Sequence, residues 1–170
     1  NAHGIFGKYK KKPLGSIGHF STFSFHSTKN LSCGEGGALV INDFKFIERA
    51  HTIREKGTNR HKFVKREISK YTWVDKGSSF LPGELIAAFL YAQMSQSAEI
   101  TRRRLNIWSQ YYDFFASDDF PQGSISIDLP VVPPDCTHNA HMFYLLLPSR
   151  LQRDRFIAEL KNRGVSSVFH

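Results

Sequence analysis

A lysine in a polar, glycine-containing loop between two short strands is the feature that most constrains this chain. Residues 20–25 alternate aromatic and small polar side chains, as a strand with one buried face does. Residues 37–41 form a second apolar run, and the loop between the runs holds Lys29 with serine, threonine, histidine and glycine. An amine in such a loop suits imine chemistry, because neighbouring hydroxyls and backbone N–H groups can hold a phosphate. A solvated loop lysine beside a glycine turn is the alternative that these residues leave open.

The rest of the chain predicts a mixture of helices and strands. Asp43 is expected to cap the first helix, and apolar residues recur at helical spacing from Glu84 to about Phe115, which predicts one long helix. Residues 58–82 show no clear period and are expected to be irregular. We expect helices at 44–56, 84–115 and 151–163, and further strands at 141–147 and 165–169. This order of elements is typical of an α/β protein.

Charge and cysteine content limit the partners of the chain. The formal net charge is +8, but the basic residues are scattered along the sequence, so we expect no nucleic-acid interface. The basic residues could form a solvated surface, or they could steer small anions such as nucleotide diphosphates to the protein. No apolar run approaches the roughly 18 residues that cross a bilayer, so no membrane contact is expected. Cys33 and Cys136 lie far apart without metal-ligand spacing, which predicts free thiols, no metal site and a cytoplasmic location.

Two segments resemble a known family. Residues 23–30, Phe-Ser-Phe-His-Ser-Thr-Lys-Asn, and residues 33–39, Cys-Gly-Glu-Gly-Gly-Ala-Leu, resemble the lysine segment of the DegT/DnrJ/StrS sugar aminotransferases. These are fold type I enzymes that use pyridoxal 5′-phosphate (PLP). The resemblance continues through 53–60, 70–75, 77–82, 139–144 and 168–170. It implies an α/β fragment: the later part of the PLP-binding large domain (1–92), a bridging helix (93–116) and the start of the small C-terminal domain (117–170).

The resemblance also implies roles for individual residues. Lys29 would form the imine with PLP and later carry the proton between substrate and cofactor. Ser24 would bind the PLP phosphate, His3 would lie beside the cofactor ring, and Ser79, with Ser78, would reach the phosphate of the neighbouring subunit. His26 and His170 would approach the substrate, although His26 could instead be a structural histidine and the two serines could be plain turn residues.

The activity implied by the resemblance is amination of a nucleotide sugar. One branch of the family would convert a dTDP-4-keto-6-deoxyhexose to the 4-amino sugar, with glutamate as the donor, in a homodimer that serves surface-polysaccharide synthesis. The chain looks cut at both ends: the aspartate that pairs with the pyridine nitrogen is expected one residue before Asn1, and the phosphate-binding turn and a stacking aromatic residue further upstream. An inactive fragment or interaction module is the second hypothesis, and a basic nucleic-acid-binding domain is the third.

Overall fold

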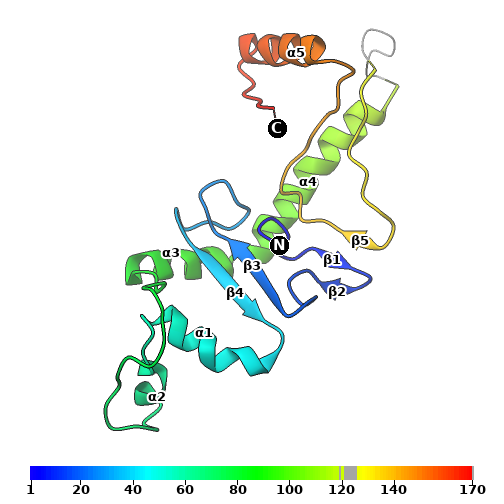
Figure 1. Cartoon of the computed structure of the whole chain (residues 1–170). Coiled ribbons are helices and arrows are strands. Elements are labelled where there is room, and N and C mark those ends of the chain that lie inside the picture. Colours follow the sequence, from blue (N-terminus) through cyan, green and yellow to red (C-terminus); the bar gives the residue numbers. More distant parts are fainter. Residues whose placement is uncertain (119, 121–125, 170) are drawn as a thin grey trace.

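The computed structural model describes residues 1–118, 120 and 126–169. The described elements form an elongated molecule rather than a single compact layer, with α2 (Arg60–Val64) at one end and α5 (Arg150–Asn162) at the other (Figure 1). Among the described residues, no helix combines the length and the apolar character needed to cross a membrane.

Two strands frame the loop that carries Lys29. Strands β3 (Phe20–Ser24) and β4 (Gly37–Ile41) pair antiparallel, from Phe20 opposite Ile41 to Ser24 opposite Gly37. Strand β4 has the predicted bounds, and β3 ends at Ser24, one residue before the end of the strand predicted at 20–25. The hairpin therefore fixes both ends of the loop at residues 25–36.

A second sheet joins the start of the chain to a distant segment. Strands β1 (Lys8–Tyr9) and β2 (Lys12–Pro13) form a hairpin, and β5 (Cys136–Thr137) pairs antiparallel with β1, which gives the order β2-β1-β5. This pairing brings the first residues of the chain next to those that follow β5 (Figure 1).

The predicted helix at 44–56 is shorter and begins differently. Asp43 accepts a hydrogen bond from the backbone N–H of Lys45, as an N-cap should, but the first turn is the 3-10 helix η1 (Phe44–Phe46), and α1 (Ile47–Arg54) follows. The expected irregular segment contains the short helix α2 and two isolated bridges, Glu55 to Ser79 and Thr58 to Trp73.

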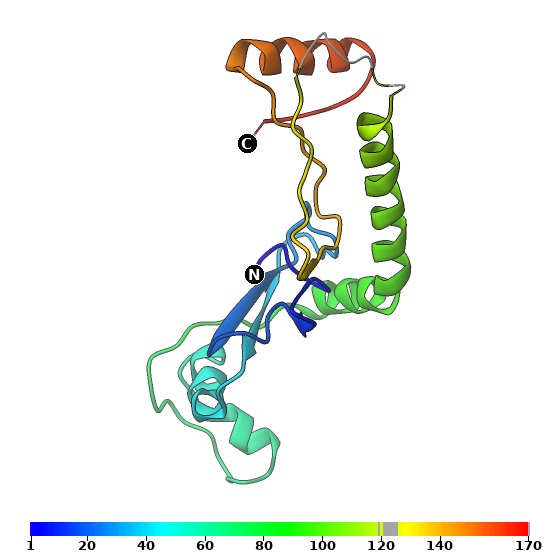
Figure 2. The same ribbon diagram turned by 90° about the vertical axis from the view of Figure 1, so that its right-hand side faces the viewer.

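The prediction of one long helix from Glu84 to Phe115 is wrong. The structure has α3 (Glu84–Ser95) and α4 (Ser97–Ala116), which meet at a sharp bend (Figure 2). Gln96 leaves the helical conformation, its N–H bonds Gln93 in a 3-10 turn, and the Ser95 hydroxyl donates to the Ala92 carbonyl. A serine hydroxyl that competes for a helical carbonyl weakens the helix locally, and the apolar period does not detect this.

The two predicted late strands are also wrong. Over 141–147 the structure has only an isolated bridge between Asp128 and Leu146, and residues 165–169 belong to no strand. Both segments have the composition of strands, but a strand exists only where a partner satisfies its backbone groups. The helix predicted at 151–163 is present as α5, and Gly164 follows it with a φ of +78°.

The apolar core lies directly beneath the Lys29 loop. Phe25, Leu31 and Cys33 are buried together. Ile5, Phe23, Leu90 and Ile100 pack around them from the start of the chain, β3, α3 and α4. Four separate segments therefore hold the loop in place.

Candidate functional site

The Lys29 loop is closed by its own backbone. The N–H groups of Phe25 and Ser27 donate to the carbonyls of Gly36 and Gly34, at 2.8 and 2.9 Å, which extends the β3–β4 pairing into the loop. The N–H of Lys29 donates to the His26 carbonyl at 2.9 Å. Lys29 is half-buried, so the loop presents its amine from a fixed backbone.

Ser24 and His26 take part in the same turn. The Ser24 hydroxyl accepts from the His26 N–H at 3.3 Å. His26 Nδ1 accepts from the Thr28 N–H at 3.3 Å and lies 3.0 Å from the Thr28 hydroxyl. His26 Nε2 lies 3.5 Å from a carboxylate oxygen of Glu35, whose side chain is exposed. These contacts order the turn before Lys29, which favours the structural alternative for His26.

A turn at residues 138–141 connects this loop to the start of the chain. The Asn30 side-chain amide donates to the Asn139 carbonyl at 2.7 Å. The Asn139 amide donates to the carbonyls of His3 and Ile5, at 2.7 and 2.8 Å. Asn30 and Asn139 are buried, so each would be costly to leave unpaired. His3 and the residue next to Lys29 are thus held by a single asparagine.

His141 lies between these two groups. Its ring stacks on that of His3, with centroids 4.2 Å apart, and its Nδ1 lies 2.8 Å from Asn30 Oδ1. Burial, followed by the positive charges of His3, Lys29 and Arg104, lowers the pKa of His141 to about 4. His141 is therefore a neutral ring at pH 7.

Arg104 on α4 holds the backbone of the 138–141 turn. Its guanidinium donates to the carbonyls of Ala140 and His141, at 3.1 and 2.7 Å. Ala140 has a φ of +51°, a conformation that a residue with a Cβ adopts at some cost. The bidentate contact offsets this cost, and burial lowers the pKa of Arg104 from its ordinary value.

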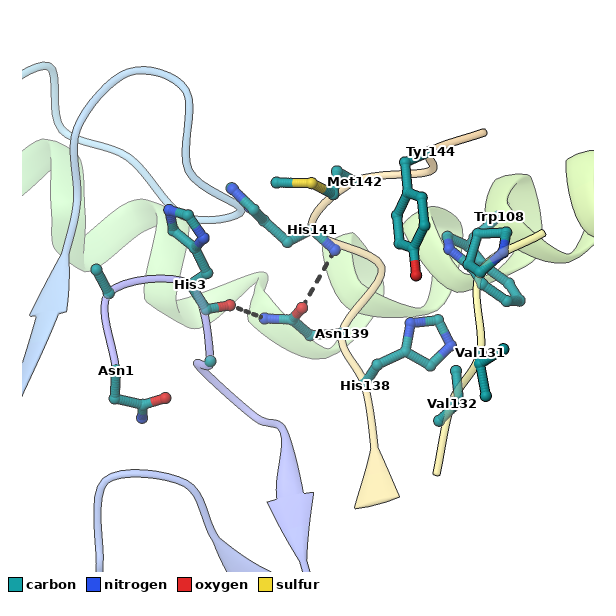
Figure 3. A pocket seen from close by; sticks show the side chains of 13 residues that line it. Asn1, His3, Trp108, Val131, Val132, His138, Asn139, His141, Met142 and Tyr144 are labelled. Atoms are coloured by element: carbon teal, nitrogen blue, oxygen red, sulfur yellow. Dashed lines mark hydrogen bonds between the residues drawn. The ribbon is translucent and has the colours of Figure 1, made fainter. Parts of the chain in front are cut away.

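A cavity of about 540 Å³ opens beside His3 and His141 (Figure 3). Trp108, His138 and Tyr144 line its other side, and His138 packs edge-on against Trp108 with ring centroids 4.4 Å apart. Burial lowers the pKa of His138. Imidazole and aromatic rings thus form part of the wall, beside the aliphatic side chains of Val131 and Val132. Ser24 and Lys29 are not among the lining residues of this cavity.

The other residues singled out by the sequence lie elsewhere. Ser79 is exposed and forms a bridge with Glu55, just beyond the end of α1. Its contacts therefore belong to the α1 end of the molecule and not to the Lys29 loop. His170 falls outside the described residues.

Sequence reasoning missed Asn30, Arg104 and His141 as members of the site. Arg104 bonds carbonyls more than 30 positions away in the sequence. The contacts of Asn30 with Asn139 and His141 each join residues more than 100 positions apart. The sequence of the Asn139–Tyr144 segment resembles that of the family. No local period, however, indicated that its asparagine and histidine side chains contact the Lys29 loop.

The group of donors at this site fits PLP. A half-buried amine can react with a carbonyl, and the hydroxyls of Ser24 and Thr28 can donate to a phosphate monoester. The N–H groups of residues 25–29 already donate to partners inside the loop. Among the described residues, no group of histidine, cysteine and carboxylate side chains could hold a metal ion.

Known proteins resemble the chain along its whole length. It is 29% identical over 170 residues to dTDP-3-amino-3,4,6-trideoxy-alpha-D-glucose transaminase of Streptomyces venezuelae, covering 99% of this chain and 40% of that protein. It is also 29% identical to the spore coat polysaccharide biosynthesis protein SpsC of Bacillus subtilis, covering 99% and 44%. The chain therefore spans less than half the length of these relatives.

A solved structure matches the fold. The putative sugar aminotransferase Spr1654 of Streptococcus pneumoniae, in its PMP form, superposes with a TM-score of 0.81 at 23% identity, over 100% of this chain and 42% of that one. The α/β fold predicted from the sequence is thus confirmed as part of a fold type I transferase. Residues 1–170 match the DegT/DnrJ/EryC1/StrS aminotransferase family as a whole, and the chain belongs to that family.

Proposed function

We propose that this chain is the lysine-bearing part of a PLP-dependent sugar-nucleotide aminotransferase. The observation that carries the proposal is the Lys29 amine, which extends from a closed, hydroxyl-rich loop bonded through Asn30 to the residues around His3. Family membership supports the reaction class.

Each residue then has a definite task. When bound, PLP withdraws electrons from the carbon that exchanges its amino group. Lys29 holds the cofactor through its amine and later moves the proton at that carbon. The Ser24 hydroxyl would bind the phosphate. His3 would lie against the ring, and Ser79 would act from a second subunit of a homodimer.

The substrate we propose is a dTDP-4-keto-6-deoxyhexose, with glutamate as the amino donor. The whole protein would then be a dTDP-4-amino-4,6-dideoxygalactose transaminase in the cytoplasm, acting in the synthesis of a surface polysaccharide such as lipopolysaccharide or enterobacterial common antigen. The motifs at 70–75, 77–82 and 139–144 favour amination at C4. The Streptomyces relative is named for a 3-amino sugar, so the position of the keto group is the point to test.

The test uses the full-length product of the encoding gene. Purified protein with PLP and glutamate is given the 4-keto or the 3-keto sugar nucleotide, and 2-oxoglutarate release is followed. We expect turnover with the 4-keto sugar that Lys29→Ala abolishes and Lys45→Ala, an exposed lysine paired with Asp43, does not. Turnover confined to the 3-keto sugar would overturn the C4 proposal, and turnover that survives Lys29→Ala would overturn the role of Lys29.

A further inference from the structure

The tautomer of His141 follows from its hydrogen bonds. The Asn30 Nδ2 group donates to the Asn139 carbonyl, which can only accept, so the amide orientation is fixed. Asn30 Oδ1 must then accept from His141, and the 2.8 Å contact places the proton on Nδ1. In a neutral ring Nε2 is therefore unprotonated, and it forms no hydrogen bond with the described residues.

We propose that Asn30 and Arg104 are positioning residues: Asn30 selects the Nδ1–H tautomer of His141, and Arg104 fixes its backbone, so that the unprotonated Nε2 stays in place beside His3 and the Lys29 loop. The proposal rests on the function proposed above, since the site it serves is that of Lys29. The neutral ring supplies an acceptor at the cavity wall and adds no positive charge next to the lysine.

Three elements supply the charged groups around His141. His3 comes from the start of the chain, Lys29 from the loop after β3, and Arg104 from α4, and all three disfavour a cationic ring. Asn30 adds a neutral acceptor where a carboxylate would favour the cation. A carboxylate at position 30 would therefore oppose the burial and the positive charges that keep His141 neutral.

The first test reads the tautomer without any turnover. Full-length protein labelled with ¹⁵N-histidine is studied by long-range ¹H–¹⁵N correlation NMR, and the His141 signals are assigned by their loss in His141→Gln. We expect a neutral Nδ1–H ring at pH 7. An Nε2–H tautomer or a cationic ring at pH 7 would overturn the proposal. An inactive protein with the expected NMR signals would contradict the aminotransferase function and leave the tautomer assignment intact.

Asn30→Asp tests the selecting residue by titration. A carboxylate in place of the amide oxygen should raise the pKa of His141 by at least about 1 unit. Asn42→Asp is the matched control, because Asn42 also donates to backbone carbonyls, those of Gly15 and Gly18, and has no recorded contact with His141. An unchanged His141 titration in Asn30→Asp would show that residue 30 does not control the ring.

Arg104→Met tests the second positioning residue through kinetics. The variant keeps much of the side-chain volume and removes both donors, so we expect kcat to fall about 10- to 100-fold with KM changed much less, and Arg104→Lys to restore part of kcat. Arg103→Met is the control on the same helix, where the exposed Arg103 pairs with Glu99. A folded Arg104→Met protein with unchanged kcat would overturn its role.

Arg104→Lys keeps the role testable if Arg104→Met does not fold. The lysine retains the positive charge but cannot reproduce the two-pronged contact with the Ala140 and His141 carbonyls. A fall in kcat with an unchanged His141 tautomer would support the positioning role. An unchanged kcat in Arg104→Lys would then overturn it.

Discussion

At the scale of single residues, two lysines of the described chain are half-buried: Lys62, which pairs with Glu48, and Lys29. Its own N–H is bonded to His26, and the next residue, Asn30, is buried. We predict that Lys29 is the only lysine that reduction with borohydride in the presence of PLP modifies. Peptide mapping of the reduced full-length protein checks this, and the exposed Lys45 serves as the internal comparison. A modified peptide that lacks Lys29 would contradict the assignment.

His141 predicts an acid-sensitive contribution to stability. Its pKa is about 4 in the folded protein and about 6.5 in an unfolded chain, so the unfolded state binds more protons between these values. This contribution is complete above about pH 6.5 and is lost as the pH falls towards 4, at up to about 1.4 kcal/mol per pH unit, reduced by the partial exposure of the ring.

Denaturant unfolding of the full-length protein at pH 7 and pH 5.5 measures the effect of His141. The carboxylates with lowered pKa values titrate below this range and contribute little to the difference. We expect the difference in unfolding free energy between the two pH values to shrink in His141→Gln. An identical difference in wild type and variant would exclude His141 as its source.

The two kinds of site residue show what sequence can predict at this scale. Lys29 and Ser24 lie within one short motif, so the sequence alone indicates that the amine and the hydroxyl belong to the same site. Asn30, Arg104 and His141 acquire their roles through contacts between distant segments, and an asparagine or arginine in a sequence does not indicate whether its partner is water or a buried carbonyl.

At the scale of elements, Gly57 and Gly77 allow two backbone segments to touch. A Cβ on Gly77 would lie 2.2 Å from the Gly57 nitrogen and 2.7 Å from the Ile53 carbonyl oxygen. The segment that carries Ser79 is bonded here, through Ser78 N–H to Ile53 at 3.0 Å. We predict that Gly77→Ala separates the segments and destabilises the full-length protein by roughly 1–3 kcal/mol.

Gly83→Ser is the matched control for this glycine. A Cβ on Gly83 meets nothing within 4 Å, and the residue is the N-cap of α3, where serine changes stability by only a few tenths of a kcal/mol. Thermal unfolding of both variants compares them directly. A melting temperature for Gly77→Ala equal to that of Gly83→Ser would show that the contact between the two segments carries little stability.

Elements were predictable where the pattern is local. Strands β3 and β4 and helix α5 follow from side-chain period, capping residues and glycine positions. The break at Gln96 and the missing strands at 141–147 and 165–169 depend on backbone hydrogen bonds, which are not determined by an apolar period. The wrong predictions therefore concern segments whose composition suits a helix or strand but whose backbone hydrogen bonds are not made as that element requires.

At the scale of the whole molecule, the surface is too large for a self-contained protein. The chain exposes 12685 Å², whereas a folded monomer of its mass of 19.4 kDa exposes about 8,500 Å². In the described part of the chain, the buried hydrophobic core consists of Phe25, Leu31, Cys33 and Ala140. Helix α3 is apolar yet has no buried residue, with Leu85 exposed to 87%. Such a helix is typical of the interior of a larger assembly.

We therefore predict that the 170-residue chain expressed alone associates or precipitates and gives no more amino transfer than free PLP. Its exposed apolar surface lacks the protein that would cover it, and Lys29 alone provides none of the orientation on which the rate depends. Light scattering and 2-oxoglutarate release from glutamate and the keto sugar measure the two outcomes. A monodisperse chain whose turnover exceeds that of free PLP and disappears in Lys29→Ala would contradict this prediction. It would mean that the loop, His3 and the 138–141 turn suffice for the reaction.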